Sequence, residues 1–114
     1  MRQCLTAVVD RNVTWDGDFA TEPWEAAWAR EAIFFVRLLA ADGEPAPDQP
    51  VLAGRVQLSP DGMHWCDEGT ELRLAAGQGL GLARVSHFGG WLRLRGTIAP
   101  GVRLRVIAYL TLKD

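Results

Sequence analysis

The last part of the chain, residues 102–112, alternates strictly enough to constrain the fold more than any other feature of the sequence. Every second position carries an aliphatic side chain: Val102, Leu104, Val106, Ala108, Leu110 and Leu112. The positions between them are mostly basic or polar, with Ile107 as the exception. Because successive side chains of a strand point to opposite faces of a sheet, this period of two predicts a long, half-buried antiparallel strand.

The segment before it, residues 91–97, has leucines on one face and arginines on the other. Residues 98–101 (Ile-Ala-Pro-Gly) separate the two alternating segments and have turn composition. We therefore expect residues 91–97 and the last strand to form a hairpin. Residues 87–90 (His-Phe-Gly-Gly) form the turn that leads into it.

The middle of the chain repeats this pattern. Residues 52–58 alternate, and Ser-Pro-Asp-Gly at 59–62 supplies a tight turn, because proline fixes φ and glycine tolerates positive φ. A return strand is expected over residues 63–67 and a further short strand over residues 71–74. Residues 76–81 form a glycine-rich link.

Residues 23–41 fit two interpretations. Their alanine, glutamate and leucine content is compatible with an amphipathic helix, but apolar side chains occupy mostly even positions and charged side chains odd ones. We interpret the segment as one or two strands that bend near residues 29–30, with a helix over residues 22–31 as the alternative. Residues 33–36 (Ile-Phe-Phe-Val) are apolar on both faces, as in a central strand or one that meets another subunit.

Length and composition place these strands in one domain. At 114 residues the chain has the size of a single core, and its 12 glycines and 6 prolines fall between apolar runs. We expect an all-β fold with little or no helix: a two-sheet antiparallel sandwich or jelly roll of roughly eight to ten strands over residues 1–114. The polar, proline-rich loop at residues 42–50 lies within this domain.

Charge and hydropathy limit the partners and the compartment. The net charge of −2 does not predict a nucleic-acid partner, and no apolar run is long enough to span a membrane. The N-terminus lacks the apolar stretch of a signal peptide, so we expect a cytoplasmic protein, compatible with incorporation in a particle. Two cysteines, Cys4 and Cys66, either pair or stay reduced.

The charges are also segregated along the chain. Residues 1–36 hold six acids and three bases, whereas residues 84–114 hold six bases and one acid. The two ends either neutralise each other across neighbouring strands or join subunits to one another.

Catalytic and metal-binding patterns are absent from the sequence. His64 and Cys66 fall on one face of a strand, but a zinc site requires three or four converging ligands. The glycines of residues 77–81 precede a strand and not the helix that a phosphate loop requires. Ser86 beside His87 is not a triad, whose members meet in space. We expect neither enzymatic activity nor a cofactor.

Tryptophan and arginine supply the candidate binding residues. Trp65 and Trp91 oppose the aliphatic faces of their strands, where they either pack or stack on a ligand such as a glycan. Four arginines on the expected last hairpin share its outward face and form a candidate patch for an anionic partner, with Arg55 and Arg73 as additional members: Arg93, Arg95, Arg103 and Arg105.

The order of these segments resembles a known class of proteins. A strand, a Pro/Gly loop and a second strand ending Val-Gln-Leu-Ser precede Asp-Gly-x-x-Trp, and the chain closes with Gly-Gly-Trp, Gly-Thr, a turn and an alternating strand. Residues 31–112 thereby resemble small β-sandwich structural proteins of the virion or decoration type, encoded by tailed phages and phage-like operons. The resemblance implies a non-catalytic, symmetric homo-oligomer mounted on a larger protein assembly.

Our leading hypothesis is therefore a self-associating structural subunit, and the alternative is a carbohydrate-binding module that uses Trp65 and Trp91. The candidate subunit interface comprises the two-sided apolar strand and the tryptophans before it: Ile33, Phe34, Phe35, Trp24 and Trp28.

Overall fold

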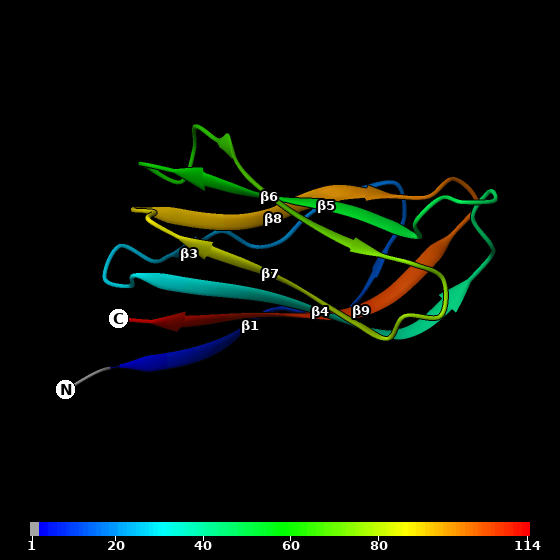
Figure 1. The fold of residues 1–114 in the computed structure, drawn as a ribbon, viewed down its shortest axis with the longest axis horizontal. Coiled ribbons are helices and arrows are strands. Elements are labelled where there is room, and N and C mark those ends of the chain that lie inside the picture. The colour runs from blue at the N-terminus through cyan, green and yellow to red at the C-terminus, as the bar shows by residue number, and fades with distance from the viewer. Residues whose placement is uncertain (1–2) are drawn as a thin grey trace.

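The computed structural model describes residues 3–114, which form nine strands and no helix, and therefore no helix that could cross a membrane. The strands are β1 (Cys4–Trp15), β2 (Asp18–Ala20), β3 (Trp24–Glu25), β4 (Glu31–Asp42), β5 (Leu52–Ser59), β6 (Cys66–Leu74), β7 (Leu80–Ser86), β8 (Trp91–Ile98) and β9 (Arg103–Lys113). They make two antiparallel sheets packed face to face, which confirms the predicted β-sandwich (Figure 1).

The two sheets divide the strands almost alternately along the chain. Sheet A has the order β1-β9-β4-β7, and sheet B has the order β2-β8-β5-β6, with β3 also paired to β8. In the described part of the chain, β5 and β6 alone are consecutive strands that pair with each other. Apart from β2 to β3, every other connection passes from one sheet to the opposite one.

The expected hairpin of residues 91–97 and 102–112 is wrong, because β8 lies in sheet B and β9 in sheet A. The connection between them is buried on both sides of an exposed Pro-Gly turn: Ile98, Ala99 and Val102 all face the interior. The amide of Ala99 donates to the carbonyl oxygen of Val51 at 3.0 Å, which ties the connection to the residue just before β5. Apolar residues on both sides of the Pro-Gly turn therefore carry the chain across the end of the core instead of reversing it within one sheet.

Strand β9 supplies the middle of the core. Its inward side chains are fully buried: Leu104, Val106, Ala108, Leu110 and Leu112. They face an equally apolar inner surface of sheet B, formed mainly by leucines of β5, β6 and β8. The alternation read in the sequence is thus the alternation between core and solvent.

Residues 23–41 form two strands, as we interpreted them. The short β3 ends at Glu25, a bend follows over residues 26–30, and β4 begins at Glu31. The bend carries the chain from sheet B to sheet A. It contains no helical residues, so the helix alternative is excluded. The loop at residues 43–50 is mostly exposed.

Trp15 and Phe19 form a stacked aromatic pair at one side of the core, next to two glycines on neighbouring strands. The rings of Trp15 and Phe19 stack with their centroids 4.0 Å apart. Phe19 lies opposite Gly96, which in turn lies opposite Gly54 of β5. A Cβ atom at Gly96 would collide with the carbonyl oxygen of Ala53, so this close approach of β8 and β5 requires glycine.

This packing predicts that Gly96→Ala lowers the free energy of unfolding by about 1–3 kcal/mol, because the backbone must move to admit the methyl group. Urea unfolding measures the effect. Gly79→Ala is the matched control, since a Cβ there meets no atom within 4 Å and should change stability by less than about 0.5 kcal/mol. Equal effects of the two substitutions would contradict the steric argument.

Candidate functional site

Three strands of sheet B place a polar cluster on its outer surface, which we call the arginine face: Arg55, Gln57, Trp65, Asp67, Arg93 and Arg95. The register explains how these residues meet. Gln57 of β5 lies opposite Arg93 of β8 on one side and opposite Asp67 of β6 on the other. Two residues along, Arg55 lies opposite Arg95. Alternate residues of three neighbouring strands therefore make one continuous surface.

A chain of hydrogen bonds connects the side chains of the arginine face. Arg93 Nε donates to Gln57 Oε1 at 2.8 Å, and Gln57 Nε2 donates to Asp67 Oδ1 at 2.8 Å. Arg55 Nε donates to the same Asp67 oxygen at 3.1 Å. The guanidinium carbon of Arg93 also lies 4.2 Å from the centroid of the Trp65 ring. Gln57 is only 7% exposed although it points away from the core, so the cluster is packed and ordered at its centre.

The electrostatics of this cluster keep its carboxylate ionised and leave it positively charged. The hydrogen bond from Gln57 is the main cause that lowers the pKa of Asp67, helped by the hydrogen bond and charge of Arg55 and by the charge of Arg95. Partial burial lowers the pKa of Arg93, and the charges of Arg95 and Arg55 add to this effect. The guanidinium groups thus repel one another around one anionic side chain.

The turn between β5 and β6 borders the arginine face and is fixed by two side chains. The hydroxyl oxygen of Ser59 accepts from the amides of Asp61 and Gly62, at 3.2 and 2.8 Å. The carboxylate of Asp61 accepts from the amide of His64 at 2.9 Å and pairs with its ring Nδ1 at 2.7 Å. These bonds hold the chain that leads directly into Trp65.

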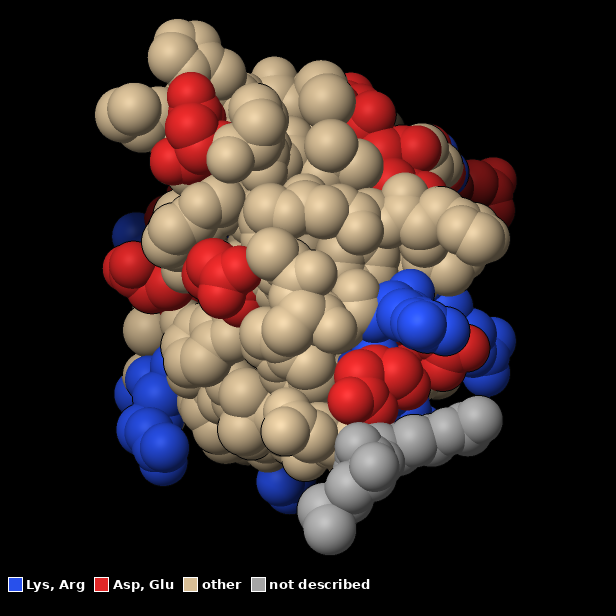
Figure 2. All heavy atoms as spheres, turned by 90° about the vertical axis from the view of Figure 1, so that its left-hand side faces the viewer, with Lys and Arg blue, Asp and Glu red and all other residues tan. Residues whose placement is uncertain are grey.

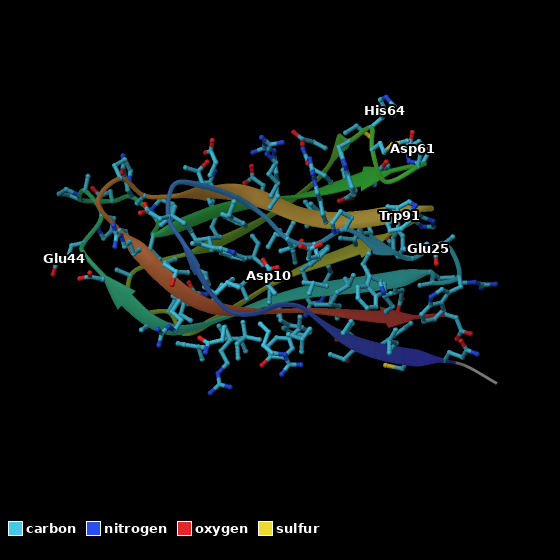
Figure 3. All side chains as sticks on the ribbon, turned by 180° about the vertical axis from the view of Figure 1, so that it is seen from behind. Asp10, Glu25, Glu44, Asp61, His64 and Trp91 are labelled. Atoms are coloured by element: carbon cyan, nitrogen blue, oxygen red, sulfur yellow. The ribbon has the colours of Figure 1, made fainter. Side chains whose placement is uncertain are left out.

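Trp91 lies beneath this turn at the same end of the sandwich, as the labelled side chains in Figure 3 show. Gly62 adopts a φ of +80°, and a Cβ there would lie 3.2 Å from the Trp91 ring. Glycine therefore lets the turn backbone approach the ring closely. One part of the Trp91 ring is covered by the turn, and the side chain remains half-exposed.

The structure divides the four predicted arginines between the two sheets. Arg93 and Arg95 lie on sheet B, but Arg103 and Arg105 belong to β9 of sheet A, so the four do not form one patch. Alternation shows which residues share a face of a strand but not which sheet receives that strand. Arg55 completes the cluster in their place, across the β5–β8 pair.

Arg103 instead pairs with Asp16, with its Nε 3.2 Å from the Asp16 carboxylate. This ion pair joins the acidic first part of the chain to the basic last part, as one of the two interpretations of the charge segregation expects. At the end of the sandwich that holds the termini, acidic and basic groups lie along the sides while the centre is largely uncharged (Figure 2).

The outer surface of sheet A has the opposite character, and we call it the apolar face: Val8, Ile33, Phe35, Leu82, Ile107 and Tyr109. The register aligns Val8, Tyr109, Phe35 and Leu82 in one row across all four strands. Leu82 is 42% exposed and the other members are half-buried. Sequence reasoning named Ile33 and Phe35 but missed the other four members of the face, because only the register brings them together with Phe35: Val8, Leu82, Ile107 and Tyr109.

The remaining predicted interface residues lie elsewhere. Phe34 is 0% exposed and points into the core, so it is not part of the outer surface. Trp24 belongs to β3 of sheet B and packs against the core. Trp28 is 38% exposed in the bend before β4. Neither tryptophan lies on the apolar face.

Asp10 is a half-buried carboxyl between the two layers, visible near the middle of Figure 3. Burial raises its pKa, and hydrogen bonds from the Trp15 side chain and the Glu22 backbone act in the opposite direction. These contacts connect β1 to the loop before β3, so we assign Asp10 a structural role.

Within residues 3–114, no three His, Cys, Asp or Glu side chains gather as metal ligands do. His64 pairs with Asp61, and the Cys66 thiol lies 3.7 Å from the carbonyl oxygen of Leu58. Cys4 and Cys66 are both free and exposed, so they do not pair with each other.

No protein-family model and no curated protein matches this sequence. Among solved structures, the fold is similar to that of the SPBc2 prophage-derived protein YomS, with a TM-score of 0.59 and 6% identity over 100% of this chain and 96% of that one. It is also similar to TmCBM61, solved in complex with β-1,4-galactotriose, with a TM-score of 0.51 and 10% identity over 90% of this chain and 69% of that one. The resemblance to phage-encoded β-sandwich proteins is thus confirmed for the fold.

The turn at residues 59–64 predicts a pH-dependent contribution to stability. Hydrogen bonds from His64 hold the pKa of Asp61 far below its usual value, so its stabilising effect is present above about pH 4 and is lost as the pH falls below that. Asp61→Ala should therefore lower the urea midpoint at neutral pH, and its difference from the parent protein should shrink only in acid. A difference that stays constant from neutral to strongly acidic pH would contradict this role.

Proposed function

We propose that this chain is a non-catalytic, self-associating structural subunit whose copies join through the apolar face and that it belongs to a larger protein assembly. The observation that supports this proposal is the row of Val8, Tyr109, Phe35 and Leu82, which crosses the whole outer surface of sheet A. A sandwich sheet that ends in water normally carries polar side chains on its outer surface. A contiguous apolar row there is typical of a surface that another molecule covers.

The outer surface of sheet A, of which the apolar face is the part bordered by Arg37 and Arg84, fits a second copy of the same chain. From the usual strand spacing and rise, that whole surface is about 19 Å wide and up to about 40 Å long, and shorter along the seven-residue β7. That area is roughly the ~800 Å² per partner that a standard interface buries. In a two-fold arrangement, the central pair of Phe35 and Tyr109 packs near the axis against its own copy. Both arginine faces then remain on the outside, because they lie on the opposite sheet.

The winding of the chain also supports this proposal. The orders β1-β9-β4-β7 and β2-β8-β5-β6 describe a chain that alternates between sheets, which we infer to be a jelly roll. Jelly rolls recur in viral capsid proteins and in lectins. The similarity in fold to the prophage-derived YomS is consistent with a part in a phage-like assembly.

Leu82→Glu tests the subunit interface. Leu82 is already 42% exposed, so a charge there should leave the fold intact while it places carboxylates within the proposed contact. We expect light scattering to show an oligomer for the parent protein and a monomer for the variant at tens of micromolar. Met63→Glu, the same kind of change at a 73% exposed residue in the β5–β6 turn of the opposite sheet, is the control and should remain oligomeric. A parent protein that is monomeric under these conditions would refute the proposed self-association.

The second candidate function is saccharide binding by the arginine face. The observation that favours it is the ordered series of Trp65, Arg93, Gln57 and Asp67, which combines an aromatic surface with planar hydrogen-bonding groups. Sugars are held by such combinations, because their rings stack on indoles and their hydroxyl groups both donate and accept. The similarity in fold to TmCBM61, solved with a galactotriose, is consistent with this function.

Trp65→Ala is expected to abolish saccharide binding on a glycan array and to remove the ligand-dependent change in tryptophan fluorescence. Trp28→Ala is the matched control, because Trp28 is an exposed tryptophan in the bend before β4 and lies outside the arginine face. Binding that survives Trp65→Ala would exclude this surface as the saccharide site.

A further inference from the structure

We propose that the arginine face recognises an acidic saccharide, with a ligand carboxylate held by Arg93 and Arg95 and the adjoining sugar ring placed against Trp91, beside the Arg93–Trp65 pair. The proposal rests on the second candidate function and specifies the charge of its ligand. It is independent of self-association, since the two surfaces lie on opposite sheets.

The first argument is an imbalance of charge on the outer surface of sheet B. Arg55 forms an ion pair with Asp67 at 3.1 Å, and Arg73 forms one with Glu71 at 3.3 Å. Arg93 and Arg95 make no ion pair with any residue in the range 3–114. Two neighbouring arginines of β8 thus form no ion pair, and Arg95 acts on Asp67 only through its charge.

The second argument is that Arg93 is held in place before any ligand arrives. Its Nε donates a hydrogen bond to Gln57, which in turn donates one to Asp67, and its guanidinium carbon lies over the Trp65 ring. Its two terminal amino groups take part in none of the hydrogen bonds formed by residues 3–114. A guanidinium that is already positioned loses little conformational entropy on binding, and its free amino groups match the two oxygens of a carboxylate.

The third argument is the spacing of the positive groups. Arg93 and Arg95 are two residues apart on one strand, about 7 Å, and Arg55 lies across from Arg95 at a Cβ separation of about 5 Å. Three guanidinium groups this close repel one another, and the single carboxylate of Asp67 compensates only part of that repulsion. A ligand anion placed among them relieves the remainder.

The surroundings favour a saccharide over a polyphosphate backbone. Asp67 and Glu71 interrupt the basic surface, so a closely spaced series of phosphates would meet carboxylates along the strand direction. A sugar acid has one carboxylate per ring, and its hydroxyl groups can donate to Asp67. Trp65 and Trp91 border the arginines on the side of the β5–β6 turn, where a ring attached to the carboxylate would lie.

Isothermal titration calorimetry with two matched oligomers tests the proposal: a short oligogalacturonate and a neutral galactose oligomer of the same length. We expect the acidic oligomer to bind at least about tenfold more tightly, because each added charge-assisted hydrogen bond strengthens binding by about that factor. Polyglutamate, a polyanion without sugar rings, should bind at least about tenfold more weakly than the oligogalacturonate.

Two arginine variants separate this site from general positive charge. Arg95→Gln should weaken oligogalacturonate binding about tenfold or more. Arg73→Gln removes the same charge from the same face, but this arginine is already paired with Glu71, so binding should change by less than about twofold. Circular dichroism of both variants verifies that the fold is retained.

Each result decides the proposal. Equal binding of the acidic and neutral oligomers would overturn it while leaving saccharide binding standing, and binding of neither would overturn both. Equal affinity for polyglutamate would show an acidic peptide surface instead. If Arg95→Gln dissociates the oligomer in light scattering, the arginine face is a subunit contact and the proposal fails.

Discussion

The pairing of β9 with strands on both of its sides is the constraint on which the rest of the structure depends. It joins the first strand, β1, to β4, and its inward side chains fill the middle of the core. Because β9 occupies the centre of sheet A, the preceding strand cannot lie beside it and is placed in sheet B. The position of one alternating strand thereby determines how the chain must cross between the layers.

The same alternation gives the sandwich two unlike outer surfaces. Each strand buries the side chains of one face in the core, so the side chains that can contact other molecules are on the other face. On sheet A that face is apolar around Phe35 and Tyr109, and on sheet B it is basic and hydrogen-bonded around Gln57 and Arg93. A subunit built in this way can have one contact surface and one recognition surface that do not compete, since the hydrophobic layer separates them.

Local patterns in the sequence located several strands but not their neighbours. They did not predict β1 or β2, and the two short strands expected over residues 63–67 and 71–74 are one strand, β6, which begins only at Cys66. Alternation located β9, the bend before β4 and the β5–β6 hairpin, because each depends on residues close together in the chain. It misplaced Arg103 and Arg105, whose sheet is decided by the buried connection at Ile98 and Val102. It likewise missed Val8 and Leu82 as neighbours of Phe35. The sequence of one strand does not show which distant strand pairs with it.

The central place of β9 also has a consequence for how the protein is made. A ribosome releases β1 first and β9 last, yet these two strands are direct neighbours in the finished sheet. Until β9 emerges, β1 has no partner on its only paired edge and β4 lacks one of its two. Sheet A therefore cannot close during synthesis, and the nascent chain exposes unpaired strand edges that attract other chains. The β5–β6 hairpin, by contrast, can form early because it needs no distant segment.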